Sequence, residues 1–263
     1  MRYLWDLSED YFKRLPKLIV SVINVYFKWL KKWDRATSEK VDIFIANSKN
    51  IAQKISQFYG KQATVIYPPM DIPKETINLV SVNEGGNFFL IVSALVPYKR
   101  IDIAVEAFNS LRMPLRIVGD GPLLKELKKR ARYEGIEFEG WLKQDVLWDR
   151  YRHTRALIFP GEEDCGIAPM EAQAFGKPVI AYGKGGVTET VLAANGTAAS
   201  RSSGESTGIF FYEQRPEALV EAVMSFTRLR FDPEFIQTHA CQFAKKHFEI
   251  KFKHLLESCI ITT

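Results

Sequence analysis

The stretch ALIFPGEEDCGIAPMEAQAFGKPVIAYGKGGVTE, residues 156–189, decides the expected fold of this chain of 263 residues. Its first residues, 156–159, have the continuous apolar pattern of a buried strand, and a polar loop that contains glycine follows at 160–166. A short helix comes next. Pro169 suits its first turn, where a missing N–H costs nothing, and Gly176 with the proline two residues later indicates its end. These residues predict one strand–loop–helix unit.

A second unit of the same kind follows directly. Residues 179–182 have a strand pattern, 183–186 form another glycine-rich loop, and a second helix is expected from about Val187. In an open parallel sheet both loops emerge at the same carboxyl edge, and each leads into a helix N-terminus, whose free N–H groups attract anions. Glu163 and Glu171 flank the start of the first helix, and carboxylates suit hydroxyl groups. The pattern predicts a pocket for a ligand that is part phosphate and part polyhydroxyl.

The residues EDCGIAPMEAQAFGKPVIAYGKGGVTETV, 163–191, closely resemble the Glu-x7-Glu signature of retaining glycosyltransferases of family four, which have the GT-B fold. Glu163 and Glu171 occupy the two glutamate positions of that signature. The resemblance implies that Glu163 acts on the hexose of the donor and that Glu171 holds the ribose hydroxyls. Glu189 ends the motif, and it is expected to orient the second loop.

Backbone groups of the same segment complete the donor site that the resemblance implies. The amides of Cys165, Gly166 and Ile167 would contact sugar hydroxyls, and Gly185 and Gly186, with the helix start after them, would cradle phosphate. The cysteine stands where close relatives usually have phenylalanine. A reactive thiol beside a helix N-terminus is one interpretation, and a small buried packing residue is the other.

The chain from about residue 88 to 211 alternates strand and helix patterns, with six strands in all. The first strand, FFLIVSAL, is a continuous apolar run, as expected for a buried parallel strand. This alternation predicts a doubly wound α/β domain. With the resemblance, the expected fold class is α/β of the GT-B type: one complete Rossmann-like donor domain of about six parallel strands, together with a fragment of the N-terminal acceptor domain.

The first loop of this domain, VPYKR, carries two cations. Lys99 suits phosphate as a point charge, and Arg100 suits it as a bidentate donor. The resemblance makes Lys99, with Glu163, a catalytic residue that contacts the donor diphosphate, and the alternative for Lys99 is a solvated helix start. Most family members have an arginine five residues before this lysine, whereas this chain has Ala94. That departure weakens the expected diphosphate site, and Arg100 is the side chain that would compensate.

Two more turns of this domain border the expected nucleotide pocket. Gly119 and Gly121 belong to the turn GDGP, a sequence that alone indicates only a turn. The later turn that ends at Leu142 resembles the place where the family's backbone contacts the nucleobase. Trp141 in that turn is interpreted as a core or rim residue, with stacking on the base as the alternative.

The segment before the donor domain has a βαβ pattern at 41–71, which resembles the last part of the acceptor-binding domain in the same enzymes. The expected division is a remnant of the acceptor domain at 1–72, a nucleotide-sugar donor domain at 73–232, and a C-terminal helical segment at 233–263 that crosses back to the first domain. Family members carry most of a first domain before this point. We therefore expect either a shortened chain or a partner that supplies the rest.

Residues 10–33 combine an apolar centre, which is too short to span a bilayer, with basic flanks. One interpretation is an amphipathic helix on an anionic membrane, and the other is a helix packed in a domain core. Because a single βαβ unit cannot bury both faces of its sheet, we expect exposed apolar surface around residues 18–33. This surface would contact a membrane or a second copy of the chain.

Composition limits the classes of protein and ligand that remain. The formal charge of +5 fits anionic substrates or an anionic membrane surface, and no nucleic-acid-binding signature is present. Three cysteines and four histidines lack the spacing of a metal site, and the first residues lack the apolar core of a signal peptide. We expect a protein without metal or cofactor in the cytoplasm, with a peripheral position at the inner membrane face as an addition.

The expected reaction moves a hexose from a GDP- or UDP-linked donor to a glycan or lipid-linked acceptor, with retention. Likeness of SALVPYKRID and FPGEEDCGI to mannosyltransferases favours GDP-mannose. The rival is a module that binds a nucleotide sugar without turnover, or half of a split enzyme. A glycoside hydrolase is disfavoured because the two glutamates do not face each other across a bond. A dehydrogenase is disfavoured because no G-x-G-x-x-G follows a strand.

Overall fold

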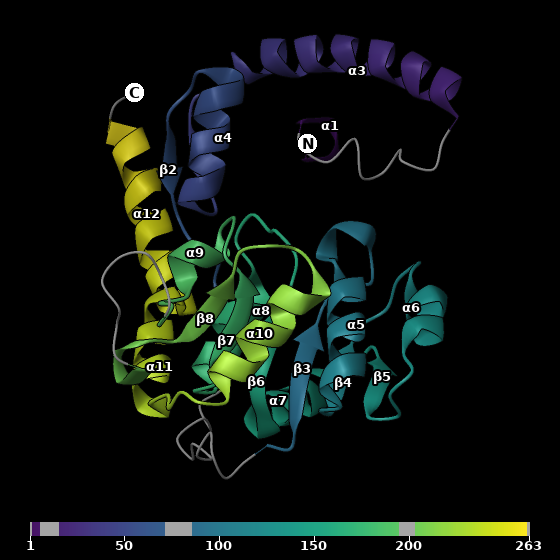
Figure 1. The fold of residues 1–263 in the computed structure, drawn as a ribbon. Coiled ribbons are helices and arrows are strands. Elements are labelled where there is room, and N and C mark those ends of the chain that lie inside the picture. The colour runs from purple at the N-terminus through teal and green to yellow at the C-terminus, as the bar shows by residue number, and fades with distance from the viewer. Residues whose placement is uncertain (1, 6–15, 72–85, 195–202, 262–263) are drawn as a thin grey trace. The chain divides into compact units, whose positions relative to one another are not determined.

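The computed structural model describes residues 2–5, 16–71, 86–194 and 203–261 of the chain (Figure 1). The chain divides into two compact units, Met1–Val65 and Ile66–Thr263, which are described separately below. Within the described ranges, none of the helices has both the length and the apolar character that crossing a membrane requires.

The larger unit is built on one six-stranded sheet in the order β5-β4-β3-β6-β7-β8, in which every neighbouring pair is parallel. The strands are β3 (Phe88–Val92), β4 (Leu115–Val118), β5 (Ile136–Gly140), β6 (Thr154–Phe159), β7 (Val179–Tyr182) and β8 (Gly208–Phe211). The predicted doubly wound α/β domain is therefore confirmed. The strand order reverses between β3 and β6, and ligands of open α/β sheets bind beside such a switch point.

Helices cover both faces of this sheet, as the ribbon in Figure 1 lets the reader follow. The helices α5 (Ile101–Leu111), α6 (Leu124–Arg130) and α10 (Pro216–Phe226) pack on one face, and α7 (Gln144–His153), α8 (Ile167–Ala174) and α9 (Val187–Thr190) pack on the other. Alternate residues of β3 supply the two cores, because successive strand side chains point to opposite faces: Phe89 joins the first core and Phe88 the second. The helix expected from Val187 is a single turn of four residues.

The C-terminal part of this unit consists of α11 (Pro233–Ala240), a 3-10 turn at Cys241–Phe243 and α12 (Lys245–Ile261). Met70 is tied to it through two backbone hydrogen bonds, which it makes with Phe243 and Lys245 at 3.1 and 3.2 Å. His239 is half-buried, and its Nε2 atom lies 3.0 Å from the carbonyl oxygen of Thr190. This histidine therefore contributes to the packing of α11.

The smaller unit contains α1 (Arg2–Trp5), α3 (Lys17–Ser38), β1 (Phe44–Ala46), α4 (Lys49–Tyr59) and β2 (Ala63–Val65). The strands β1 and β2 are parallel, and α4 connects them, which confirms the predicted βαβ unit. The helix α4 begins where Ser48 accepts a hydrogen bond of 3.1 Å from the N–H of Ile51. It ends at Gly60, whose φ of 68° is the left-handed conformation that glycine adopts easily.

A half-buried polar contact fixes α3 within the smaller unit. The carboxylate of Asp34 accepts hydrogen bonds from the indole of Trp5 at 2.8 Å and from the hydroxyl of Tyr59 at 2.7 Å. Burial, followed by this carboxylate, raises the pKa of Tyr59 to about 12. Because α1, α3 and α4 each supply one of these groups, the rotation of α3 about its own axis is set.

Candidate functional site

The loops after β3 and β6 meet at the switch point of the sheet. Lys99 ends a single 3-10 turn after β3, and its Nζ atom forms an ion pair with Oε1 of Glu163 in the loop after β6. Both side chains are largely buried, with 15% and 17% of their surface exposed. The close approach of the two loops requires Gly161, since a β-carbon there would lie 2.9 Å from the α-carbon of Lys99. The structure thus brings together the two residues predicted to be catalytic.

The loop after β7 joins the same group. Gly186 donates a backbone hydrogen bond of 2.8 Å to the carbonyl oxygen of Glu163. Gly185 has a φ of 82°, in the left-handed region that favours glycine. A β-carbon on Gly186 would lie only 2.1 Å from the carbonyl oxygen of Asp164. Backbone contact therefore fixes the second glycine-rich loop against the first, at one carboxyl edge of the sheet.

The segment that leads into α8 offers hydrogen-bond donors to this edge. In the described chain, none of the N–H groups of Cys165, Gly166 and Ile167 donates a hydrogen bond to a backbone carbonyl. Cys165 itself is buried with 4% of its surface exposed. Burial raises the pKa of the Cys165 thiol to about 12, and the nearby carboxylates of Glu189 and Glu163 act in the same direction. The thiol is therefore a packing group, which agrees with the second interpretation of this position.

Glu171 lies one turn into α8, and Tyr151 of α7 contacts it. The Tyr151 hydroxyl donates a hydrogen bond of 2.8 Å to Oε2 of Glu171. The tyrosine is completely buried, and its ring stacks on Phe175 with 5.6 Å between centroids. Burial raises the pKa of Glu171, the Tyr151 hydrogen bond opposes that rise, and Asp71 adds to it. The hydroxyl thus holds this carboxylate in one orientation.

A second tyrosine contacts the other predicted glutamate of the motif. The hydroxyl of Tyr67 donates a hydrogen bond of 2.8 Å to Oε2 of Glu189, in α9. Burial and then this hydrogen bond raise the pKa of Tyr67 well above its usual value. The Tyr67 ring packs edge-on against Phe243 at 5.3 Å. Glu189 is therefore anchored to the segment after β2, which fixes the single helical turn that follows Gly186.

The two turns expected to border a nucleotide lie at the same edge, on the other side of β3. Gly119 has a φ of 124° and donates a 2.7 Å hydrogen bond to the carbonyl of Gly140, so the turns after β4 and β5 are joined. A β-carbon on Gly121 would lie 2.6 Å from the carbonyl oxygen of Leu95. Leu142 packs against the second core, whereas Trp141 is 78% exposed. Trp141 is accordingly not a core residue, and its exposure fits either a rim position or stacking on the base.

Arg100 has protein partners in this structure. Its Nε atom lies 3.3 Å from Oδ1 of Asp102, and its Nη1 atom donates to Oε1 of Gln214 at 3.4 Å. Gln214 in turn donates a hydrogen bond of 3.0 Å to the carbonyl of Pro160. The arginine and the glutamine thus tie the loops after β3, β6 and β8 together. Of these residues, Gln214 was not predicted as part of the site. The one feature of the sequence that could have indicated it is its position just after the last strand.

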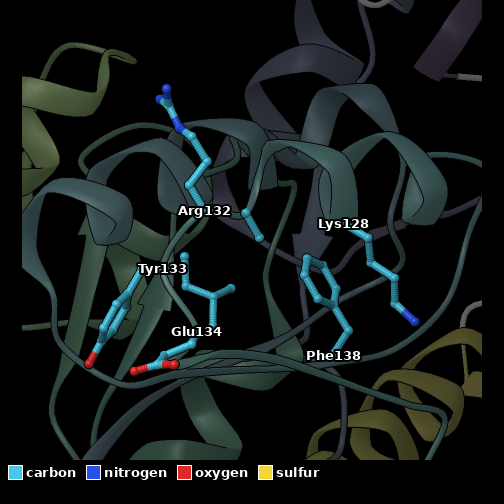
Figure 2. Close-up of a pocket in the computed structure, with 7 residues that line it drawn as sticks. Lys128, Arg132, Tyr133, Glu134 and Phe138 are labelled. Atoms are coloured by element: carbon cyan, nitrogen blue, oxygen red, sulfur yellow. The ribbon is translucent and has the colours of Figure 1, made fainter.

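A separate hollow of about 380 Å³ lies beside β5, near the amino end of that strand. Figure 2 shows Tyr133 and Glu134 on one side of it and Lys128 and Phe138 on the other, while the guanidinium of Arg132 points away. Lys99 and Glu163 lie in loops at the opposite, carboxyl edge of the sheet, so this hollow is not part of their site. The described residues contain no group of histidine, cysteine and carboxylate side chains suited to a metal ion.

Comparison with known proteins gives consistent matches. Residues 73–239 match the family model described as glycosyl transferases group 1. The chain is 30% identical over 155 residues to O-antigen chain mannosyltransferase C of Escherichia coli, which covers 53% of this chain and 41% of that protein. It is 36% identical over 117 residues to a GDP-mannose-dependent alpha-(1-6)-phosphatidylinositol monomannoside mannosyltransferase of Mycobacterium tuberculosis, which covers 38% of this chain and 30% of that protein.

A solved structure shares the fold. Anabaena HepE in complex with UDP and glucose superposes with a TM-score of 0.66 at 19% identity, over 83% of this chain and 63% of that one. The matched segments span less than half of the length of the two curated relatives.

Proposed function

Because the chain belongs to the glycosyl transferases group 1 family, whose model matches residues 73–239, we propose that it moves a hexose from a nucleotide diphosphate sugar to a glycan acceptor, with retention at the anomeric carbon. The observation that carries this proposal is the contact between Lys99 and Glu163 at the switch point between β3 and β6. A cation for the diphosphate and a carboxylate for the sugar meet there, where open α/β sheets bind their ligands.

In this proposal the donor lies across the carboxyl edge of the sheet. The diphosphate binds Lys99 and the backbone of Gly185 and Gly186, and the hexose hydroxyls bind Glu163. The amides at the start of α8, which lack backbone acceptors in the described chain, complete the sugar site. As the bond from the anomeric carbon to the diphosphate breaks, negative charge builds on the leaving oxygen, and these fixed donors stabilise it.

The nucleoside is held on the two flanks of this site. Glu171 accepts hydrogen bonds from the ribose hydroxyls, and its carboxylate is oriented for this by Tyr151. The base lies near the joined turns of Gly119 and Gly140, where the chain continues to Leu142. Holding the whole nucleotide fixes the position of the anomeric carbon, and this positioning lowers the barrier to transfer.

The names of the relatives support a choice of donor. Two relatives are named as mannosyltransferases, one of them as GDP-mannose-dependent, and HepE was solved with UDP and glucose. We favour GDP-mannose as the donor and place a UDP-hexose second. The acceptor in the proposal is a glycan carried by a lipid, so the transfer takes place at the cytoplasmic face of a membrane.

A second candidate is a module that binds the donor without turnover, or half of a split enzyme. The observation that favours it is Ala94, which stands where most family members have an arginine five residues before Lys99. The two candidates share the same donor site, and they differ only in whether a hexose leaves the nucleotide.

Isothermal titration of the purified chain with GDP-mannose, UDP-glucose, GDP and UDP tests the site. Release of GDP or UDP with and without a mannosylated acceptor tests turnover. The proposal expects binding of one nucleotide class and acceptor-dependent release. Binding without release favours the module, and absence of binding by the native chain to all four nucleotides overturns both candidates. Lys61→Gln is the matched control for a change at Lys99, because Lys61 also pairs with a glutamate, Glu39 at 2.6 Å, but lies in the smaller unit.

A further inference from the structure

The helix α3 presents a continuous row of apolar side chains to solvent. The row recurs at intervals of three and four residues, so it follows one face of the helix: it consists of Ile19, Val22, Tyr26, Trp29 and Trp33. These side chains are between 48% and 66% exposed, and Val25 beside them is 69% exposed. Single exposed apolar residues are ordinary on a protein surface, but a row of five along one helix, with a sixth beside it, marks an interaction surface.

The row points away from the packing of the smaller unit. Four half-buried apolar residues of α3 each directly follow a residue of the row, so the packed side lies about 100° around the helix from the row; these residues are Val20, Ile23, Phe27 and Leu30. On that side Asp34 accepts the hydrogen bonds from Trp5 and Tyr59 described above. Because this contact fixes the rotation of the helix, the apolar row is not turned inward within the unit.

Basic residues border the row. The carboxyl-terminal part of α3, residues 24–38, contains four basic residues and one acidic residue. The acidic residue is Asp34, which accepts the hydrogen bond from Trp5 on the inner side. Two of the basic residues, Lys31 and Arg35, lie over the ring of Trp5 on the inner side, 5.1 and 5.2 Å from its centroid, and the other two are Lys28 and Lys32. Lys28 and Lys32 are exposed, and each directly precedes a tryptophan of the row, which places them along its flank. The surface therefore pairs apolar and aromatic area with a positive edge.

We propose that this face of α3 docks the protein on an anionic lipid surface, with the helix lying in the plane of the interface. The apolar row enters the boundary between headgroups and acyl chains, Tyr26, Trp29 and Trp33 lie at the headgroup level, and the two lysines contact lipid phosphates. This inference deepens the proposed function, because it places the transfer at the surface that carries a lipid-linked acceptor. The lipid contact itself does not depend on turnover.

A second copy of the chain is the competing occupant, since the same spacing also suits a coiled coil. Two features favour lipid. Three of the five row positions are aromatic, whereas coiled-coil seams take leucine, isoleucine and valine. The charges on the exposed flank of the row have one sign, and two such helices would repel each other instead of forming opposite-charge pairs.

Vesicle flotation of the full chain tests the proposal. We expect binding to vesicles of phosphatidylcholine mixed with phosphatidylglycerol, weaker binding to phosphatidylcholine alone, and loss of binding at high salt. The double change Lys28→Gln with Lys32→Gln is expected to weaken binding to anionic vesicles about tenfold or more, because each basic residue contributes at such a surface. Trp29→Ser with Val25→Ser is expected to weaken binding to a similar degree.

Matched controls come from the larger unit. Lys128→Gln with Lys129→Gln removes an exposed basic pair of α6, and Met224→Ser removes an apolar side chain that is 42% exposed on α10. Both are expected to leave flotation unchanged. Circular dichroism of each variant shows that it is folded, including the smaller unit that contains α3. Nucleotide binding by each variant separates failure of the lipid contact from failure of the donor site. Absence of flotation with either lipid, or flotation that the α3 changes leave intact, overturns the proposal. A stable dimer by light scattering together with absent flotation assigns the face to a second copy.

Discussion

The hydroxyl of Tyr151 donates a hydrogen bond of 2.8 Å to the carboxylate of Glu171, from a side chain that is itself completely buried. The two residues come from different helices and lie twenty positions apart in the chain. Burial of Glu171 raises its pKa, and the Tyr151 hydrogen bond is the one interaction that opposes the rise. The tyrosine therefore both orients the carboxylate and favours its ionised form.

Tyr151→Phe is expected to make nucleotide binding more sensitive to acid. The ring remains stacked on Phe175, but the hydrogen bond that lowers the pKa of Glu171 is lost, so that pKa moves further up. Binding of a ribose by a carboxylate is strongest above its pKa and is lost as the pH falls through it. Titration calorimetry with GDP or UDP at several pH values should therefore show an acid limb displaced to higher pH.

The groups around Glu171 make this interpretation specific. Tyr151 comes from α7 and Asp71 from the segment after β2, and Asp71 raises the pKa in both the parent chain and the variant. Tyr133→Phe is the control, since that tyrosine lies beside β5, away from the site. A Tyr151→Phe variant that loses affinity equally at every pH would show that the hydroxyl acts only by stabilising the fold.

The ion pair of Lys99 and Glu163 predicts opposite effects for its two members on binding of the free nucleotide diphosphate. Lys99→Gln is expected to weaken GDP or UDP binding about tenfold or more, because a charge-assisted hydrogen bond contributes roughly 1.5–3 kcal/mol. Glu163→Gln is expected to strengthen it several-fold, because the carboxylate competes with the phosphates for the lysine. Both variants should lose transfer activity, since the proposal gives each a role with the intact donor.

Calorimetry on the two single variants and the double variant forms a cycle that isolates this competition. The tightening caused by Glu163→Gln should disappear when Lys99 is already replaced. Equal weakening by both single changes would contradict a competing ion pair and would place Glu163 among the groups that bind the diphosphate directly.

Much of this edge follows from local pattern. Gly176 and the proline two residues later end α8 as the sequence indicates, and the alternation of strands with helices fixes a parallel sheet. In a parallel sheet every loop after a strand lies at one edge, so the neighbourhood of Lys99, Glu163 and Gly186 could be expected once the strands were assigned. These features depend on residues close together in the chain.

The contacts that orient the side chains could not be predicted in the same way. Tyr151 belongs to an apolar helix stripe, and spacing alone gives no indication that its hydroxyl reaches Glu171. Tyr67 donates to Glu189 across 122 positions, and Gln214 reaches Arg100 across 114. Arg100 was predicted to bind phosphate, but a sequence pattern does not show that Asp102 and Gln214 engage its guanidinium. Such contacts depend on tertiary packing.

Cys165 and Cys241 are expected to differ sharply in reactivity. Cys165 is buried and its pKa is raised to about 12, so at about pH 8 only ~1 thiol in 10,000 is ionised. Cys241 is exposed. Labelling of the native chain with a chromogenic disulfide reagent, followed by peptide mapping, should modify Cys241 and leave Cys165 unmodified until denaturant is added. Rapid native labelling of Cys165 would contradict its role as a packing residue.

The last prediction concerns the backbone of the turn after β4. Gly119 has a φ of 124°, and a β-carbon there would lie 2.0 Å from the carbonyl oxygen of Ser93. Gly119→Ala therefore combines backbone strain with a clash against main chain, and we expect it to lower the free energy of unfolding by roughly 2–4 kcal/mol. Urea denaturation followed by circular dichroism measures this. Gly204→Ala is the matched control, since a β-carbon there meets nothing within 4 Å, and it should change the stability by less than about 0.5 kcal/mol.

Because Gly119 also donates to the carbonyl of Gly140, the shift that relieves the clash should separate the two turns that the proposal places beside the base. Nucleotide binding should then weaken in the folded Gly119→Ala protein, and an unchanged affinity would remove these turns from the donor site.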